Sequence, residues 1–240
     1  MKEIFLNLKD PNINGEKAFF DHIQANTNTI FDIGSKENSI LSNFGGEVHY
    51  FNPLERELGK LKDKISNSNQ SFFINDYALG SSTLKKDLFI EEKNFFGTFN
   101  PAESSTISVL VKDSRSYMLD LEDGKEKKID LLKIKARGGE LDIIQGFKEY
   151  IKNIKLIQFN YGPYYIKRGV KLNDLITYLK SKSFVDFSYL STSGYIPFQK
   201  LKGTRIKVNP LIGNGEAIEA FQGEQINDHY NYCNIICRKL

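Results

Sequence analysis

Two kinds of apolar pattern alternate along the chain. Short apolar runs rich in β-branched and aromatic residues end at polar residues or glycine, and such runs are typical of buried strands. Between them, apolar residues recur every three or four positions, the spacing that places them on one face of a helix. Strands are predicted at residues 29–33, 48–51, 71–74, 87–90, 106–111, 129–135, 155–159, 184–190 and 232–237, and helices at 16–24, 39–44, 52–65, 140–151 and 172–179.

Residues 129–140, with the sequence IDLLKIKARGGE, combine both patterns. A buried strand ends at Lys135, two glycines form a tight turn, and a helical pattern follows. In an α/β sheet this arrangement places side chains at the carboxyl edge of the parallel strands, where ligands bind, so we expect Lys135 and Arg137 at that edge. The alternation of strands and helices predicts one α/β domain over residues 1–240, with a doubly wound, mostly parallel sheet.

The charge pattern narrows the classes of partner. The chain has 33 basic and 30 acidic residues, a formal net charge of +3, and the two signs are interspersed. This balance argues against a nucleic-acid-binding surface and against a polybasic membrane anchor. The sequence has no run of about 20 apolar residues, so no membrane-spanning helix is expected. We therefore predict a soluble protein with neither nucleic acid nor membrane as its partner.

The two cysteines indicate a reduced compartment. Cys233 and Cys237 stand four apart in YCNIICR, and strand alternation places both on one face. A structural zinc ion needs about four ligands, and the three histidines, His22, His49 and His229, are scattered along the chain. The pattern predicts buried thiols, no metal site and a cytoplasmic location.

Three common catalytic motifs are missing from the sequence. The turn after the strand at 29–33 begins Gly34-Ser35, and neither GxGxxG nor GxxxxGK[ST] occurs. No GxSxG sequence occurs either. Nicotinamide-dependent, P-loop and covalent hydrolase chemistry therefore lose support.

Five segments occur in a characteristic order: FDIGSKENSIL, VHYFNPLERELGKL, NDYALG, IDLLKIKARGGELDIIQGF and IKLIQFNYG. Their order and separations resemble the FkbM family of S-adenosylmethionine-dependent methyltransferases, over about residues 29–190, and YCNIIC is similar to the final strand of that family. The resemblance implies a Rossmann-like class I methyltransferase sheet, mostly parallel with an antiparallel last strand, and helices on both faces. It also implies methyl transfer to a hydroxyl of a small-molecule, sugar or glycan-like acceptor.

The resemblance also implies a cofactor site. S-adenosylmethionine carries an ammonium, a sulfonium and two ribose hydroxyls, so carboxylates, hydrogen-bonding groups and a glycine turn suit it. By their places in the family motifs, Asp32 and Gly34 match the first turn, Asn52 the ribose position, and Asp76 and Tyr77 the adenine contact. The cofactor-binding residues implied are Asp32, Gly34, Ser35, Asn52, Asp76 and Tyr77.

Several positions that are acidic in the family carry other residues in this chain. These are Asn52, Lys135, Arg137 and Asn160, and we take Lys135, Arg137 and Asn160 as candidate catalytic residues. A like-charge contact at ~4 Å costs roughly 1–4 kcal/mol, which disfavours a cationic cofactor beside Lys135. Two alternatives to methyl transfer therefore stay open. In the first alternative, the fold acts only as a binding module. In the second, Lys135 and Arg137, with Arg115, bind an anion such as a nucleotide-sugar diphosphate.

The candidate residues also have purely structural interpretations. Asn52 suits the N-cap of the helix predicted after it. Lys135 and Arg137 suit surface ion pairs with Glu140 or Asp142, which contribute little to stability.

Three further features are candidates for contact with an acceptor. Tyr161, Tyr164 and Tyr165 suit either an aromatic wall for a sugar or ordinary packing. The loop at 94–105, rich in Gly, Asn and Ser, is long enough to line a site. Residues 199–228 are predicted to be an irregular insertion before the last strand.

Overall fold

The computed structural model describes residues 4–6, 11, 14–66, 68, 70–91, 96–98, 106–122, 126–161, 170–191, 194–197, 205–208, 217–219 and 233–239. The chain divides into two compact units. One contains Met1–Asn26 and Leu156–Leu240, and the other contains Thr27–Lys155. The prediction of a single domain over 1–240 stays a prediction.

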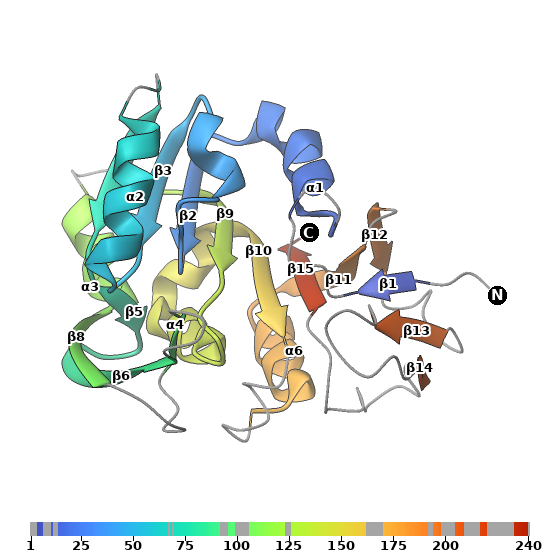
Figure 1. Cartoon of the computed structure of the whole chain (residues 1–240). Coiled ribbons are helices and arrows are strands. Elements are labelled where there is room, and N and C mark those ends of the chain that lie inside the picture. The colour runs from blue at the N-terminus through green and yellow to red at the C-terminus, as the bar shows by residue number, and fades with distance from the viewer. Residues whose placement is uncertain are drawn as a thin grey trace. The chain divides into compact units, whose positions relative to one another are not determined.

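Four parallel strands form the centre of the Thr27–Lys155 unit, in the order β9-β2-β3-β4. They are β2 (Thr29–Ile33), β3 (Glu47–Phe51), β4 (Ser71–Asn75) and β9 (Ile129–Ile134). Figure 1 shows β3, β2 and β9 side by side. Because the strands are parallel, their carboxyl ends meet at one edge, and the predicted strand pattern is confirmed here. In register, Asp32 of β2 lies between Lys133 of β9 and Tyr50 of β3.

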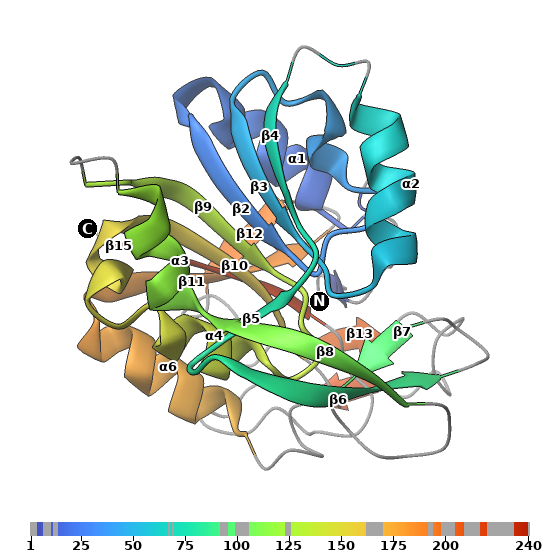
Figure 2. The same cartoon turned by 90° about the vertical axis from the view of Figure 1, so that its left-hand side faces the viewer.

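Side chains alternate between the two faces of these strands. Asp32 and Tyr50 point to one face, whereas Phe31 and His49 point to the other, where the ring of Tyr117 lies 5.7 and 5.8 Å from them. Figure 2 shows α2 and α3 on opposite sides of the strands. The helices of this unit are η2 (Ile40–Asn43), α2 (Glu55–Ile65), α3 (Ser114–Leu121), α4 (Glu140–Gly146) and η3 (Lys148–Asn153).

The helix predicted at 52–65 is confirmed as α2. Its buried residues, Leu58, Leu61 and Ile65, follow the predicted apolar stripe. The segment predicted as a helix at 39–44 is a short 3₁₀ helix, η2, which begins after Ser39. A four-residue segment makes too few backbone hydrogen bonds for a regular α-helix.

The pattern of apolar residues did not predict α3. This helix buries only Tyr117 and Met118 among its larger side chains, so its apolar face is narrow. Its start is nevertheless encoded, because the Asp113 carboxylate accepts a hydrogen bond from the Ser116 amide at 3.0 Å. An N-cap without an apolar stripe gives a weak sequence signal.

A second sheet of four strands belongs to the same unit, in the order β5-β8-β6-β7. The strands predicted at 87–90 and 106–111 lie in it as an antiparallel pair. The four strands are β5 (Ala78–Gly80), β6 (Leu84–Glu91), β7 (Phe96–Thr98) and β8 (Thr106–Asp113). Figure 2 shows β6 and β8 as its long strands. Apart from β7, most of the loop predicted to line a site lies outside the described residues.

The other unit contains a set of antiparallel strands in the order β12-β11-β15-β10. The strands of this set are β10 (Ile154–Tyr161), β11 (Phe184–Ser191), β12 (Gly194–Pro197) and β15 (Cys233–Lys239). The described helices of this unit are α1 (Glu16–Ile23), η1 (Gln24–Asn26) and α6 (Leu172–Ser181). The last strand, β15, is antiparallel to both of its partners, as predicted. The fold is therefore an α/β fold with a mixed, mostly parallel sheet.

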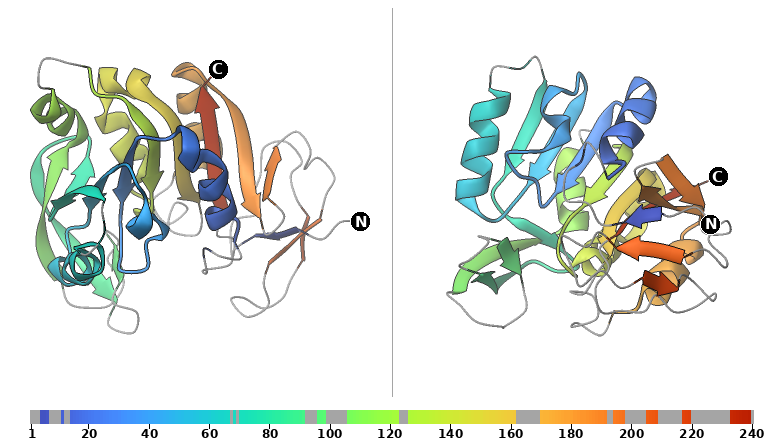
Figure 3. Two further views of the ribbon diagram at one scale, coloured as in Figure 1. Left: turned by 90° about the horizontal axis from the view of Figure 1, so that it is seen from above. Right: turned by 45° about the vertical axis from the view of Figure 1, so that its right-hand side comes forward.

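Part of the predicted insertion at 199–228 forms strands. Strand β13 (Arg205–Val208) pairs with β1 (Ile4–Leu6) in parallel and with β14 (Ala217–Glu219) in antiparallel orientation. The right-hand view of Figure 3 shows the blue β1 among the orange and red strands. The remainder of 199–228 lies outside the described residues, as do Tyr164 and Tyr165.

Two predictions from the sequence concern the cysteines and the absence of membrane-spanning helices and metal sites. Cys237 is fully buried, and burial raises the pKa of its thiol, which confirms the predicted core thiol at that position. The side chain of Cys233 lies outside the described residues. In the described part of the chain, no helix is long and apolar enough to cross a membrane. The same residues contain no group of three or more His, Cys, Asp or Glu side chains that could hold a metal ion.

Candidate functional site

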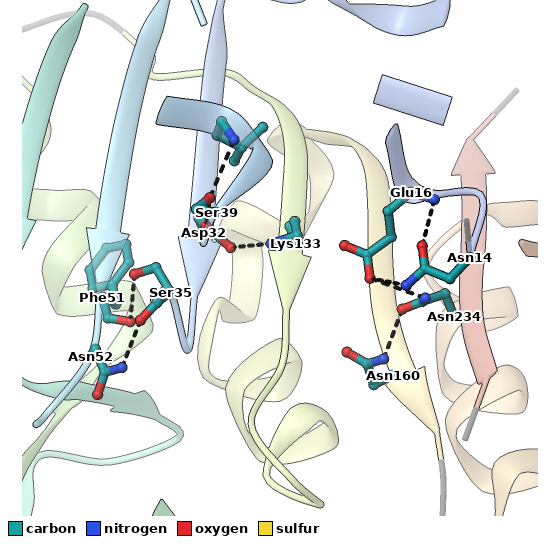
Figure 4. A network of polar contacts seen from close by, with 11 residues as sticks. Asn14, Glu16, Asp32, Ser35, Ser39, Phe51, Asn52, Lys133, Asn160 and Asn234 are labelled. Atoms are coloured by element: carbon teal, nitrogen blue, oxygen red, sulfur yellow. Dashed lines mark hydrogen bonds and ion pairs between the residues drawn. The ribbon is translucent and has the colours of Figure 1, made fainter. Parts of the chain in front are cut away.

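The carboxylate of Asp32 is fully buried near the end of β2. Its Oδ1 accepts a hydrogen bond from Lys133 Nζ at 2.8 Å, and its Oδ2 accepts one from Ser39 Oγ at 2.8 Å (Figure 4). Lys133 itself is 4% exposed. The parallel register of β2 and β9 places the two charged residues beside each other, so the ion pair follows from strand pairing.

Sequence reasoning missed Lys133 and selected Lys135 instead. Lysine is almost never fully buried without a partner. A lysine within the apolar run IDLLKI was therefore the available signal. Two buried charges are costly to desolvate, but the loss of either one leaves the other uncompensated.

Gly34 lies where the ends of β2 and β9 meet. Its φ is +77°, and a Cβ at this position would collide with the carbonyl oxygen of Lys135. The Lys135 amide donates to the carbonyl of Ile33 at 2.8 Å, and the Gly34 amide donates to Phe51 of β3 at 2.8 Å. Glycine is thus required here by backbone geometry and packing.

Ser35 and Asn52 join the turn after β2 to the end of β3. Ser35 is 2% exposed, and its hydroxyl donates to the carbonyl of Phe51 at 3.2 Å. Asn52 Nδ2 donates to the carbonyl of Ser35 at 2.7 Å (Figure 4). Asn52 Oδ1 accepts from the Leu54 amide at 2.9 Å. Both ends of the Asn52 amide therefore bond to backbone groups.

The prediction that Asn52 is the N-cap of the following helix is wrong. Helix α2 begins at Glu55, so Leu54 occupies the N-cap. Asn52 acts two residues earlier, in the turn that leads into the helix, where an asparagine side chain commonly accepts from the amide two residues on.

Asp76 and Tyr77 follow the carboxyl end of β4. Asp76 is exposed and Tyr77 is half-buried. The Tyr77 hydroxyl donates to Asn75 Oδ1 at 3.0 Å, and burial raises the pKa of this phenol. Of the six predicted cofactor-binding residues, only Asp76 is exposed.

Lys135 and Arg137 lie in the turn between β9 and α4, and both are half-buried. Arg137 has a φ of +50°, an uncommon conformation for a residue other than glycine. The buried Glu140 carboxylate holds this turn, because it accepts from the amides of Ala136 at 2.9 Å and Gly138 at 2.7 Å. The predicted position of the two cations after β9 is confirmed, and their roles stay predictions.

Asp142 and Arg115 were also considered together with these two cations, and each contacts another residue. Asp142 accepts from the Ser81 hydroxyl at 2.6 Å. Arg115 lies in the first turn of α3 and pairs with Glu149 at 2.6 Å.

Asn160 belongs to a polar cluster in the unit that contains both chain ends. Its Nδ2 donates to Asn234 Oδ1 at 2.7 Å, across the paired strands β10 and β15. Asn234 Nδ2 and Asn14 Nδ2 each donate to Glu16 Oε1 at 3.1 Å (Figure 4). Glu16 is 1% exposed, and sequence reasoning missed it because it begins an ordinary amphipathic helix.

A second polar assembly lies on the α3 face of the parallel strands and was also missed. His49 is fully buried, and its ring contacts Glu47 at 2.8 Å through Nε2 and Tyr117 at 2.6 Å through Nδ1. Burial lowers the pKa of His49, although the hydrogen bond with Glu47 opposes this effect. Burial alone would raise the pKa of Glu47, but the contacts from Lys127 and His49 outweigh it and leave that pKa below its ordinary value.

Comparison with protein families gives a match to a model described as the methyltransferase FkbM domain, over residues 21–185. This range exceeds half of the 240 residues. A search of curated proteins found no match.

Solved structures give weaker similarities. A methyltransferase FkbM from Methylobacillus flagellatus is 12% identical with a TM-score of 0.48, and the match covers 88% of this chain but 43% of that protein. A TehB-like SAM-dependent methyltransferase from Corynebacterium glutamicum is 11% identical with a TM-score of 0.43, covering 95% of this chain and 89% of the other. A putative RNA methyltransferase from Pyrococcus horikoshii is 10% identical with a TM-score of 0.42, covering 94% and 82%.

Proposed function

Because the chain belongs to the FkbM methyltransferase domain family, we propose that it binds S-adenosylmethionine and transfers the methyl group to a hydroxyl of a sugar or glycan-like acceptor. S-adenosylmethionine supplies an electrophilic methyl group on sulfur when it is bound. The protein then has to hold the nucleoside, position the acceptor hydroxyl and exclude water. The exclusion of nucleic acid as the acceptor stays a prediction from the charge pattern.

The proposed location of this site rests on one observation. The carboxyl ends of the four parallel strands are held together by backbone hydrogen bonds, from Gly34 to Phe51 at 2.8 Å, from Asn52 to Asn75 at 3.1 Å and from Lys135 to Ile33 at 2.8 Å. Ligands of α/β folds bind at this edge of the sheet. Eight candidates of this unit follow or end these strands: Asp32, Gly34, Ser35, Asn52, Asp76, Tyr77, Lys135 and Arg137.

The residues fit the cofactor better at its nucleoside end than at its ammonium end. Asp76 is exposed and Tyr77 is half-buried, so both side chains are available to an adenosine group. Asp32, by contrast, is fully buried and its charge is matched by Lys133. We therefore assign nucleoside binding to Asp76 and Tyr77, and we assign to Asp32 the role of holding the turn that contains Gly34.

Lys135 and Arg137 are proposed to act on the acceptor. Lysine and arginine in the turn after β9 suit an acceptor that carries a phosphate or carboxylate beside its hydroxyl. Asn160 belongs to the other unit, where its Nδ2 donates to Asn234, and its catalytic role stays a prediction.

A second function is favoured by the ion pair between Asp32 and Lys133. Because this pair is neutral as a whole, the cations among the candidates at the strand ends are Lys135 and Arg137, which lie with the carboxylates of Asp76 and the buried Glu140. Such an edge also suits a nucleotide-sugar diphosphate, bound without methyl transfer. In this case the fold serves as a binding module.

Calorimetric titration of the full chain with S-adenosylmethionine, S-adenosylhomocysteine and UDP-glucose tests both functions. Binding of the first two, weakened about tenfold or more by Asp76→Ala, supports the methyltransferase, since the loss of a hydrogen bond to a charged group costs about 1.5–3 kcal/mol. Asp87→Ala is the matched control, because Asp87 is also an exposed aspartate, on β6.

The absence of binding by both adenosyl compounds rejects the methyltransferase. UDP-glucose binding that is lost in the Lys135→Met/Arg137→Met double variant then supports the second function. Transfer of a labelled methyl group to hydroxyl-bearing sugars, read by mass spectrometry, tests the class of acceptor.

A further inference from the structure

Five side chains form a continuous hydrogen-bonded series, which we call the His49 series. It runs from Glu47 at the amino end of β3, through His49, Tyr117 and Asn75, to Tyr77 beyond the carboxyl end of β4. The four contacts measure 2.8, 2.6, 3.3 and 3.0 Å in that order. The series therefore connects opposite ends of the parallel strands.

The orientation of the Asn75 amide is fixed by a backbone group. Asn75 Nδ2 lies 3.1 Å from the carbonyl oxygen of Tyr50, and a carbonyl can only accept a hydrogen bond. The amide nitrogen must therefore face Tyr50 and Tyr117, and Oδ1 must face Tyr77. Because Oδ1 only accepts, the Tyr77 hydroxyl must donate to it.

The other end of the series fixes the hydrogens on His49 and Tyr117. Glu47 pairs with Lys127 at 2.5 Å and its pKa lies below the ordinary value, so its carboxylate is ionised and can only accept. His49 therefore carries a hydrogen on Nε2 and donates it to Glu47. Burial lowers the pKa of His49, so the ring is neutral and its Nδ1 accepts the hydrogen of the Tyr117 hydroxyl, whose oxygen accepts from Asn75.

Every hydrogen in the His49 series thus points toward Glu47. We propose that Asn75, held by this series, is a positioning residue that fixes the Tyr77 hydroxyl as a hydrogen-bond acceptor for the ligand. A tyrosine oxygen whose only hydrogen is used internally can offer a ligand nothing but lone pairs. The edge of the site at Tyr77 therefore selects a nucleoside group that donates, such as an exocyclic amine, over a carbonyl at the same position.

This inference rests on the proposed function, which places Tyr77 at the nucleoside. The matched probes are S-adenosylhomocysteine and S-inosylhomocysteine, because the second replaces the amine of the first by a carbonyl. We expect the wild type to bind the adenosyl compound about tenfold or more tightly than the inosyl compound. Asn75→Leu should reduce this ratio several-fold, because the freed Tyr77 hydroxyl can then donate to the carbonyl.

Tyr77→Phe should reduce the ratio in the same way, and it also serves if Asn75→Leu fails to fold. Gln70→Leu is the control for the loss of a buried amide. Gln70 bonds to the Tyr50 hydroxyl at 3.0 Å and to the carbonyls of Leu41 and Phe44, outside the series, so this variant should lose stability and keep the ratio. A merely structural role for Asn75 would leave the ratio unchanged in Asn75→Leu.

A second measurement does not depend on a ligand. The nitrogen-15 spectrum of the histidine rings should show His49 with its hydrogen on Nε2, and a hydrogen on Nδ1 overturns the inference. Unaltered discrimination in Tyr77→Phe overturns it as well. No binding of S-adenosylhomocysteine rejects the proposed function and, with it, the ligand preference, whereas binding without discrimination rejects the ligand preference alone.

Discussion

The two faces of the central parallel strands bury polar groups in opposite ways. On one face, Asp32 and Lys133 bring a negative and a positive charge into the interior, 2.8 Å apart. On the other face, the buried members of the His49 series are a neutral imidazole, a phenol and an amide, and the charged pair of Glu47 and Lys127 remains partly exposed at its end.

The difference determines which contacts the fold depends on. A buried charge that loses its partner keeps its full cost of desolvation, whereas a neutral donor or acceptor that loses its partner costs less. The charged face should therefore control stability. The neutral face should respond to pH and should determine the direction of hydrogen bonds at the ligand.

The largest expected effect is that of Lys133→Met. This change leaves the Asp32 carboxylate buried without its cation, and we expect the free energy of unfolding to fall by about 3–5 kcal/mol in chemical denaturation. Lys135→Met is the matched control two residues along, and it should cost less than about 1 kcal/mol because Lys135 is half-buried and not in the strand.

A further variant sharpens this contrast. Asp32→Asn combined with Lys133→Met removes both charges, and it should regain most of the stability that Lys133→Met alone loses. A Lys133→Met protein as stable as the wild type would show that the two faces do not differ in this respect.

The second effect is a dependence on pH that belongs to the other face. Because the pKa of His49 in the folded protein lies below its ordinary value of 6.5, the unfolded chain takes up a proton first as the pH falls. Stability is therefore fully present above pH 6.5 and declines below it, by at most about 1.4 kcal/mol per pH unit. The groups that face His49 are Glu47, Tyr117, Lys127, Phe31 and Phe73.

Unfolding measured between pH 7 and pH 5 tests this dependence. The slope should be smaller in His49→Phe, which keeps an aromatic ring but cannot bind a proton. The pKa of Glu47 is also lowered, so its contribution has the same sign but appears only below its ordinary value of 4.5. Equal slopes in the two proteins would contradict the assignment to His49.

The smallest expected effect is that of Ser39→Ala on the charged face. Ser39 donates to Asp32 Oδ2 and accepts from the Leu41 amide at 3.3 Å. We expect a loss of about 1 kcal/mol, because Asp32 keeps its ion pair with Lys133. Thermal unfolding at neutral pH measures it, and a loss as large as that of Lys133→Met would mean that the hydroxyl, not the lysine, stabilises the carboxylate.

Sequence patterns predicted the parallel strands because all four are apolar runs, and β2, β3 and β9 are buried on both faces, whereas β4 is partly exposed. They also predicted that Lys135 and Arg137 follow β9, since the end of an apolar run is visible in the sequence. They did not predict the ion pair of Lys133, because the register between β2 and β9 is set by tertiary packing and not by either segment alone.

The His49 series could not be predicted for a related reason. Its members come from β3, β4 with the residues after it, and α3, and the helix has too narrow an apolar face to be recognised. Histidine, asparagine and tyrosine also occur widely outside such networks, so their types alone do not indicate that they meet. Only the three-dimensional arrangement brings together Asn75 and Tyr117, which lie on separate elements.

In the turn after β9, the backbone is held by one side chain and the positive charge is carried by two others. Its backbone is held by the Glu140 carboxylate through the amides of Ala136 and Gly138, and these contacts do not involve the side chains at 135 and 137. Substitutions at those two positions change the electrostatic potential of the edge and leave these two backbone contacts in place. The charge at this edge can therefore be altered without removing the carboxylate that holds the turn.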